Sequence, residues 1–79
     1  MVHISQLYNV SIRLPTALLG HCDVELSNGV ILKRCCIFQR PDRAWVLIPD
    51  HPAVSDADSV RIKATILAAL RASYPEIVV

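Results

Sequence analysis

The sequence predicts an α+β fold, in which a four-stranded antiparallel meander sheet is followed by one C-terminal helix packed on one face. Three observations lead to this prediction. The first half of the chain alternates apolar and polar residues with a period of two, which is typical of strands. Two breaks in the alternation, at Asn28-Gly29 and Pro41-Asp42, carry residues that favour tight turns. The segment 60–74 lacks this alternation and is rich in alanine and leucine, as helices are.

The four expected strands are separated by residues that end strands or form turns. Apolar side chains occupy most of the even positions from Ile4 to Leu14, and Pro15 stops this alternation. Asn28-Gly29 is the strongest hairpin signal in the chain, because both turn residues must tolerate a positive φ. Strands are expected over at least 8–14, then over 21–26, 30–38 and the sequence AWVLIP, which ends at Pro49.

The first predicted hairpin turn also determines which residues face each other across the second and third strands. With two residues in the turn, the numbers of facing residues sum to 57. Cys22 then faces Cys35 on an apolar side of the sheet, and Asp23 faces Arg34 on the more polar side. The same register pairs Leu26 with Ile31, Val24 with Lys33, Gly20 with Ile37, Glu25 with Leu32 and His21 with Cys36.

The three cysteines do not form a known metal or redox motif. None has Cys-x-x-Cys spacing, and the adjacent Cys35 and Cys36 point to opposite sides of their strand. The cysteines and His21 are therefore divided between two faces and do not converge on one metal ion. The register allows either a Cys22–Cys35 bridge or two small buried thiols. For a reducing cytoplasm we expect three free thiols and no bound metal.

The second face of the sheet is expected to carry an apolar patch that a single helix cannot cover. A tight turn in the segment RPDR places Phe38 opposite Trp45 and Cys36 opposite Leu47. Such a patch suits a homodimer interface. It also suits the stacking of nucleic-acid bases on aromatic rings, with phosphates held by arginines. The patch consists of Phe38, Trp45, Leu47, Leu32 and Cys36, and its rim of Arg34, Arg40 and Arg43.

The predicted helix begins after a loop that contains three capping candidates, Ser55, Asp56 and Asp58, and it ends before Pro75. At about 100° per residue, its apolar residues form one broad side. These residues are Val60, Ile62, Ile66, Leu67, Leu70 and Tyr74.

Two basic residues, Arg61 and Lys63, lie in the first turns of the predicted helix, where the helix dipole does not favour cations. A contact with phosphate would suit this placement, and simple solvation on an exposed helix is the alternative. The two side chains project about 160° apart, so they would touch different phosphates.

Length and composition limit the class of protein. The 79 residues are expected to form a single domain, 1–79, and 53% hydrophobic content predicts a dimer or higher even oligomer. A net charge of +1 predicts that any nucleic-acid binding is weak or moderate. The N-terminus lacks the features of a secretory signal, and no apolar run is long enough to span a bilayer, so a cytoplasmic location is expected.

The chain as a whole resembles the stage V sporulation protein G family (SpoVG-like, or septation proteins) over roughly residues 4 to 74. The sequences ISQLYNVSIRL, CDVELSNGVILKRCCIF and AWVLIP resemble the family's strands, and SVRIKATILAAL resembles the start of its helix. The family's longer basic segment before His-Pro is reduced here to Asp50, which precedes His51-Pro52. The resemblance implies a small bacterial regulator, dimeric and non-enzymatic, that binds DNA or RNA, with Arg61 and Lys63 at the family's basic positions.

Two functions are therefore expected to compete. The first is a nucleic-acid-binding regulator that uses Arg61, Lys63, Arg34, Arg40 and Arg43. The second is a protein-interaction module in which Phe38, Trp45 and Leu47 bind a second copy or another partner, without nucleic acid. An enzyme is not expected, because Asp50, His51 and the nearby aspartates lie in one loop without a glycine-rich cradle or a ligand cluster. No cofactor and no small-molecule substrate are expected.

Overall fold

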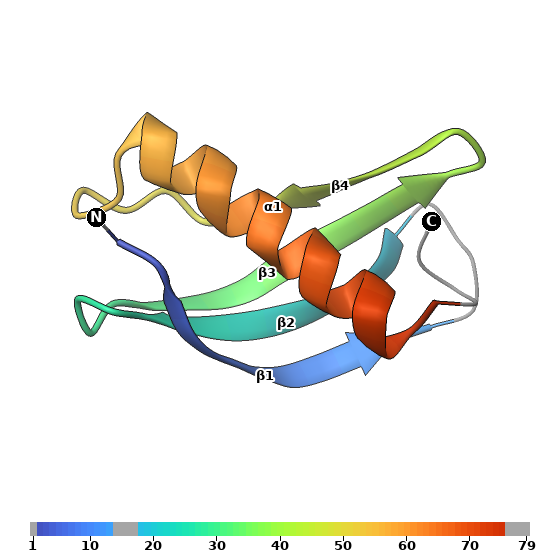
Figure 1. Ribbon diagram of the computed structural model, residues 1–79, viewed down its shortest axis with the longest axis horizontal. Helices are drawn as coiled ribbons and strands as arrows, with labels where there is room; N and C mark the ends of the chain where they lie inside the picture. The colour runs from blue at the N-terminus through green and yellow to red at the C-terminus, as the bar shows by residue number, and fades with distance from the viewer. Residues whose placement is uncertain (1, 14–17, 76–79) are drawn as a thin grey trace.

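The computed structural model describes residues 2–13 and 18–75, and these form four strands and one helix in the predicted order (Figure 1). The strands make one antiparallel sheet in the order β1-β2-β3-β4, so the predicted α+β meander is confirmed. The predicted end of the first strand, Leu14, lies outside the described residues. The elements are β1 (Ile4–Ile12), β2 (Leu18–Leu26), β3 (Ile31–Arg40), β4 (Arg43–Leu47) and α1 (Asp56–Ser73).

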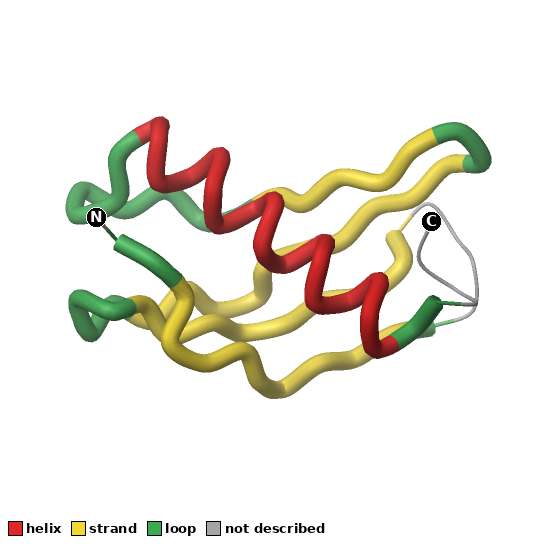
Figure 2. The backbone as a smooth tube through the Cα atoms, in the orientation of Figure 1, coloured by secondary structure: helices red, strands yellow, loops and turns green. Residues whose placement is uncertain are grey.

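The helix α1 crosses one face of the sheet diagonally, from the end of β4 toward β1 (Figure 2). The hydrophobic core lies between this helix and the sheet, and apolar burial is the main source of its stability. The other face of the sheet, which we call the open face, has no helix over it within the described residues. The core residues are Leu19, Cys22, Val24, Leu26, Leu32, Cys35, Ile37, Val46, Ile62, Ile66 and Leu70.

Helix α1 begins at Asp56, four residues before the predicted start, because a capping box forms there. The side chain of Ser55 accepts a hydrogen bond from the Asp58 amide at 3.1 Å, and the Asp58 carboxylate accepts one from the Ser55 amide at 3.4 Å. The prediction that Val60 belongs to the packed side is wrong, since this residue is 69% exposed. It lies about 120° around the helix axis from Ile66, outside the narrower buried stripe.

The turn between β2 and β3 contains three residues rather than two. The Leu26 amide donates a hydrogen bond to the Val30 carbonyl at 2.8 Å, and Gly29 adopts the left-handed φ of 85° that such a turn needs. Next to the turn, the numbers of facing residues therefore sum to 56, as in Val24 with Leu32. The prediction that Leu32 faces the second side is wrong, because this shift buries it in the core.

A β-bulge at residues 33–34 adds one residue to β3 and restores the predicted register farther along the hairpin. Arg34, in this bulge, has a left-handed φ of 57°. Beyond it, Cys22 faces Cys35, and His21 faces Cys36, as predicted. The bulge therefore separates the shifted pairs next to the turn from three pairs in the predicted register, and a second register shift follows between Leu18 and Gly20.

Strand β1 does not keep the predicted alternation of even and odd positions. Its pairing with β2 is irregular between Ile4 and Gln6 and between Tyr8 and Ser11, and Asn9 has a left-handed φ of 51°. Each irregularity changes the side to which the following residues point. The apolar residues of β1 that pack against the core are Ile4, Leu7, Val10 and Ile12.

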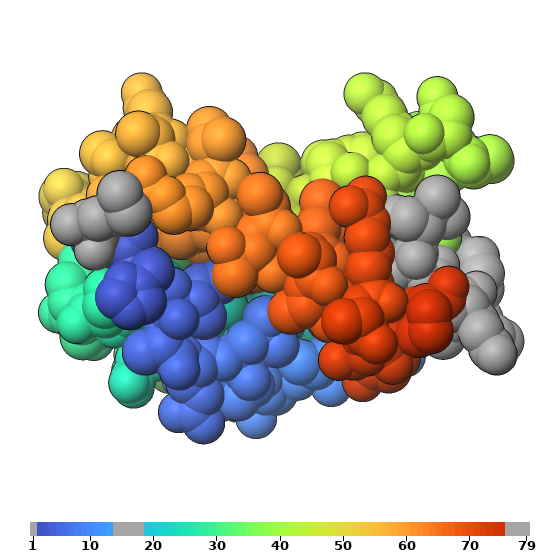
Figure 3. All heavy atoms as spheres, in the orientation of Figure 1, coloured from blue at the N-terminus to red at the C-terminus, as the bar shows by residue number. Residues whose placement is uncertain are grey.

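The hairpin of β3 and β4 has the predicted register. Phe38 faces Trp45, and Cys36 faces Leu47. The tip of this hairpin projects beyond α1 as a separate lobe at the upper right of Figure 3. Within residues 2–13 and 18–75, no helix combines the length and the apolar character needed to cross a membrane.

Candidate nucleic-acid interface

The open face carries an aromatic pair near the tip of the β3–β4 hairpin. Because Ile37 and Val46 point into the core, their neighbours Phe38 and Trp45 point to the open face. The two rings are stacked, with centroids 5.6 Å apart and planes inclined by 14°. An aromatic pair of this kind contributes about 0.5–1.5 kcal/mol beyond the area that it buries. The rings are half-buried, so they form a surface that remains partly accessible.

Two arginines of the hairpin tip extend this aromatic surface. The guanidinium carbon of Arg43 lies 4.8 Å from the centroid of the Trp45 ring, which is a cation–π contact. Arg40 faces Arg43 across the turn, and both side chains are exposed. We call Phe38, Trp45, Arg40 and Arg43 the aromatic–arginine cluster. It combines flat rings with positive charge within one hairpin.

Leu47 lies beside the cluster on the same strand and is 52% exposed. It faces Cys36, which is half-buried, with its thiol donating to the Arg34 carbonyl at 3.4 Å. The structure therefore brings Phe38, Trp45 and Leu47 together on the open face, as predicted from the sequence. The patch is smaller than predicted, because Leu32 belongs to the core.

Arg34 reaches the open face through an unusual backbone arrangement centred on Asp23. The Arg34 amide donates to one oxygen of the Asp23 carboxylate at 2.8 Å, and the side-chain amide of Asn9 donates to the other oxygen at 2.9 Å. The hydrogen bond from Asn9, followed by that from the Arg34 amide, lowers the pKa of Asp23. The predicted Asp23–Arg34 pair thus exists, and the backbone amide of Arg34 makes its hydrogen bond to the carboxylate.

Asn9 is a structurally important residue that the sequence analysis missed. Asp23 lies on β2, between β1 and β3. Its carboxylate accepts hydrogen bonds from Asn9 of β1 and Arg34 of β3, and both of these residues have a left-handed φ. Asparagine tolerates a left-handed φ better than most residues. An asparagine within a strand of apolar residues was therefore the signal in the sequence that pointed to this irregularity.

Charge is divided unequally over the open face. The acidic residues Asp23 and Glu25 lie on β2, whereas Arg34, Arg40 and Arg43 lie on β3 and β4 and are exposed. A polyanion would therefore be attracted to the β3–β4 half and repelled by the β2 strip.

Arg61 and Lys63 lie on α1, on the other side of the sheet from this cluster. The Arg61 guanidinium donates to the Asp58 carboxylate at 3.0 Å and to the Val2 carbonyl at 3.3 Å. Lys63 is half-buried. The five predicted nucleic-acid contacts are therefore divided into three on the open face and two on the helix, and the structure does not bring the two groups together.

An open depression of about 330 Å³ lies between the loop 48–54 and the start of α1. His51 lines it, and its Nδ1 atom accepts a hydrogen bond from the Ala53 amide at 3.0 Å. The His51 side chain thus satisfies a backbone amide of the loop that precedes α1. No group of three or more metal-ligating side chains occurs within residues 2–13 and 18–75.

Comparisons with protein-family models, with curated proteins and with solved structures found no match for this chain. The resemblance to the SpoVG-like family therefore stays a prediction from the sequence.

Proposed function

We propose that this protein is a small, non-enzymatic regulatory protein that binds single-stranded nucleic acid on the open face of its sheet. The observation that carries this proposal is the stack of Phe38, Trp45 and Arg43 at the hairpin tip. Bases stack on aromatic rings and on guanidinium planes, and arginines also bind the phosphates between them. Arg34, Arg40 and Arg43 are the phosphate contacts in this proposal, and Arg43 also stacks on the Trp45 ring.

Single strands suit this surface better than a duplex does. In a duplex the bases are already stacked on each other, and their flat faces are not available to side chains on a sheet. Stacking of one base on an aromatic residue contributes about 1–3 kcal/mol. With only two rings and three nearby arginines, the surface suits a short stretch of nucleic acid and moderate affinity.

The salt dependence of binding follows from the number of phosphate contacts. Three arginines that each neutralise one phosphate of a single strand give a slope of about −2 for log affinity against log salt. The acidic strip of Asp23 and Glu25 limits the contact to the β3–β4 half of the face. Arg61 and Lys63 would add contacts only for a strand that passes around the molecule to the helix side.

Self-association through the same face is a second candidate function, and the 52% exposure of Leu47 beside the aromatic pair favours it. A second copy packed on Phe38, Trp45 and Leu47 would form a dimer or a higher even oligomer. Because both uses need the same residues, nucleic acid and a second copy would compete for this surface.

One binding experiment tests the proposal and separates the two functions. Anisotropy of labelled single-stranded DNA, single-stranded RNA and duplex DNA is measured with the parent protein, with Arg43→Gln and with Arg13→Gln. The last variant removes an exposed arginine near the end of β1, at the opposite edge of the sheet, and is the charge-matched control. We expect single strands to bind, Arg43→Gln to weaken binding, and Arg13→Gln to bind like the parent.

Equal losses in the two arginine variants would contradict this site, because they would show that only total charge matters. If no oligonucleotide binds and light scattering gives a dimer mass, the open face is a self-association surface instead. If Arg43→Gln binds like the parent, the double variant Arg61→Ala with Lys63→Ala is measured in the same way. Loss of binding in that variant would place the site on the helix.

A further inference from the structure

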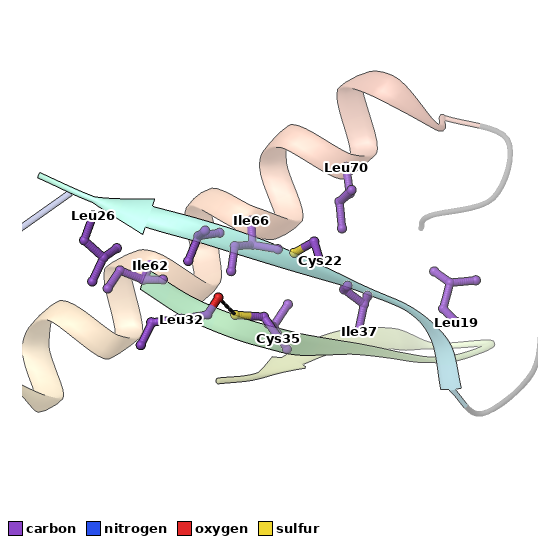
Figure 4. Close-up of a cluster of buried hydrophobic side chains, with 11 residues drawn as sticks. Leu19, Cys22, Leu26, Leu32, Cys35, Ile37, Ile62, Ile66 and Leu70 are labelled. Carbon is purple, nitrogen blue, oxygen red and sulfur yellow. Dashed lines mark hydrogen bonds between the residues drawn. The ribbon is translucent and has the colours of Figure 1, made fainter. Parts of the chain in front are cut away.

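The core contains two cysteines that face each other directly across β2 and β3. Cys22 and Cys35 are both fully buried on the side of the sheet that α1 covers (Figure 4). Directly opposed residues of antiparallel strands have Cα atoms about 4.5–5.5 Å apart. A disulfide needs a Cα separation of about 4.4–6.8 Å. A bond between these two sulfurs therefore requires little movement of the backbone.

The thiols of the pair already interact. The sulfur of Cys35 lies near two acceptors, the Leu32 carbonyl oxygen at 3.7 Å and the sulfur of Cys22. A hydrogen bond from Cys35 lowers the pKa of Cys22, against the opposing effect of burial. The same hydrogen bond, together with burial, raises the pKa of Cys35. The two thiols therefore interact within the core, with the pKa lowered at Cys22 and raised at Cys35.

We propose that Cys22 and Cys35 are a redox modification site that closes to an intramolecular disulfide when the core opens in the presence of a peroxide. Hydrogen peroxide oxidises the Cys22 sulfur to a sulfenic acid and releases one water. The Cys35 sulfur then attacks the Cys22 sulfur, the S–S bond forms, the S–O bond breaks, and a second water leaves. Two thiols and one peroxide thus yield one disulfide and two waters, and the two electrons lost by the sulfurs reduce the peroxide.

Cys36 belongs to a different class of thiol. It follows Cys35 directly, but it points to the open face and is half-buried. Peroxide therefore reaches Cys36 in the folded protein, whereas it reaches the buried pair only when the core opens. Because Cys36 points to the opposite side of the strand, it does not bridge to Cys22 in the folded chain.

The disulfide would hold the hairpin of β2 and β3 in its observed register. The bulge at residues 33–34 lies between the Cys22–Cys35 pair and the Val24–Leu32 pair. A covalent link at the first pair prevents the bulge from moving past it toward the open end of the hairpin. The link also closes the segment 22–35 into a loop, which restricts the unfolded chain and stabilises the folded one.

The test uses the full chain with Cys36→Ser, so that only the opposed pair can react. Hydrogen peroxide is added under mild denaturing conditions that open the core, and thiols are counted after full unfolding. We expect two free thiols to fall to none together, with the loss of two hydrogens in the intact mass. Peptide mapping should find residues 22 and 35 linked. The melting temperature should rise by an amount on the order of 10 °C, and a reductant should reverse the change.

The control is Cys22→Ser in the same Cys36→Ser protein, in which peroxide should not raise the melting temperature. Loss of one thiol at a time, with oxygen added to the mass, would overturn the proposal, and so would linkage only between molecules. If Cys36→Ser fails to fold, peptide mapping of the oxidised parent chain gives the same decision, because it identifies which cysteines are linked.

Discussion

Substitution of Gly20 by alanine tests whether β1 approaches β2 as closely as the structure shows. Gly20 is buried on β2 and faces Ile12 of β1. A Cβ atom added there would overlap the backbone carbonyl oxygen of Ser11 and would lie 3.0 Å from Cδ1 and 3.1 Å from Cα of Ile12. The carbonyl cannot rotate away as a side chain can, so β1 itself must move.

The magnitude follows from two opposing effects. Overpacking of a well-packed site typically costs about 1–3 kcal/mol. Reduced entropy of the unfolded chain returns about 0.4–1 kcal/mol for glycine to alanine. We therefore expect Gly20→Ala to lower the free energy of unfolding by about 1–2 kcal/mol. Since about 1 kcal/mol shifts the melting temperature of a domain this size by about 4–8 °C, urea or thermal unfolding resolves the change.

Gly29→Asn is the matched control for this experiment. Gly29 has no atom within 4 Å of its added Cβ, and asparagine tolerates the left-handed backbone better than most residues, so a smaller loss of stability than for Gly20→Ala is expected. Hydrogen exchange should also show faster exchange in β1 for Gly20→Ala alone. A Gly20→Ala protein as stable as the parent would refute the close approach of β1 to β2.

Three further predictions concern the open face. Replacing both Arg40 and Arg43 by glutamine should make the slope of log affinity against log salt shallower by about 1.4 for single strands, because each lost phosphate contact removes about 0.7. A slope equal to that of the parent would exclude both contacts. Asp23 has a pKa lowered from 3.8, so its contribution to stability is complete above the unfolded-state pKa and is lost as pH falls through the lower folded-state pKa. Asp23→Asn should therefore reduce the loss of stability below about pH 4 in urea unfolding. An unchanged acid profile would show that the hydrogen bonds from Asn9 and Arg34 to this carboxylate do not stabilise the fold. Leu47→Lys should weaken self-association measured by light scattering while preserving single-strand binding, and loss of both would show that assembly is needed for binding.

Elements with local signals were predicted well from the sequence. The β3–β4 hairpin has the expected register because a two-residue turn at Pro41-Asp42 leaves no alternative pairing. The stacking of Phe38 on Trp45 follows directly from that register. The helix was found from its composition, although its start was placed too late, because the capping box of Ser55 and Asp58 extends the helix into the preceding loop.

The errors arose where contacts between strands change the local pattern. Asn28-Gly29 gave the right hairpin but the wrong turn length, which moved Leu32 from the open face into the core. The irregularity of β1 at Asn9 depends on the Asp23 carboxylate, which is distant in sequence. The contact of Arg61 with the Val2 carbonyl joins residues 59 positions apart in the chain, so helix periodicity alone could not predict it.

The most direct test of the proposed function uses the intrinsic fluorescence of Trp45, the single tryptophan of the chain, which lies within the aromatic–arginine cluster. Short single-stranded DNA and RNA oligonucleotides are titrated into the protein at several salt concentrations, with duplex DNA as the comparison. Base stacking on the cluster predicts saturable quenching by single strands that weakens as salt rises, and little quenching by the duplex. Fluorescence that stays unchanged with every oligonucleotide, while anisotropy shows that they bind, would contradict the proposed site and place binding elsewhere on the molecule.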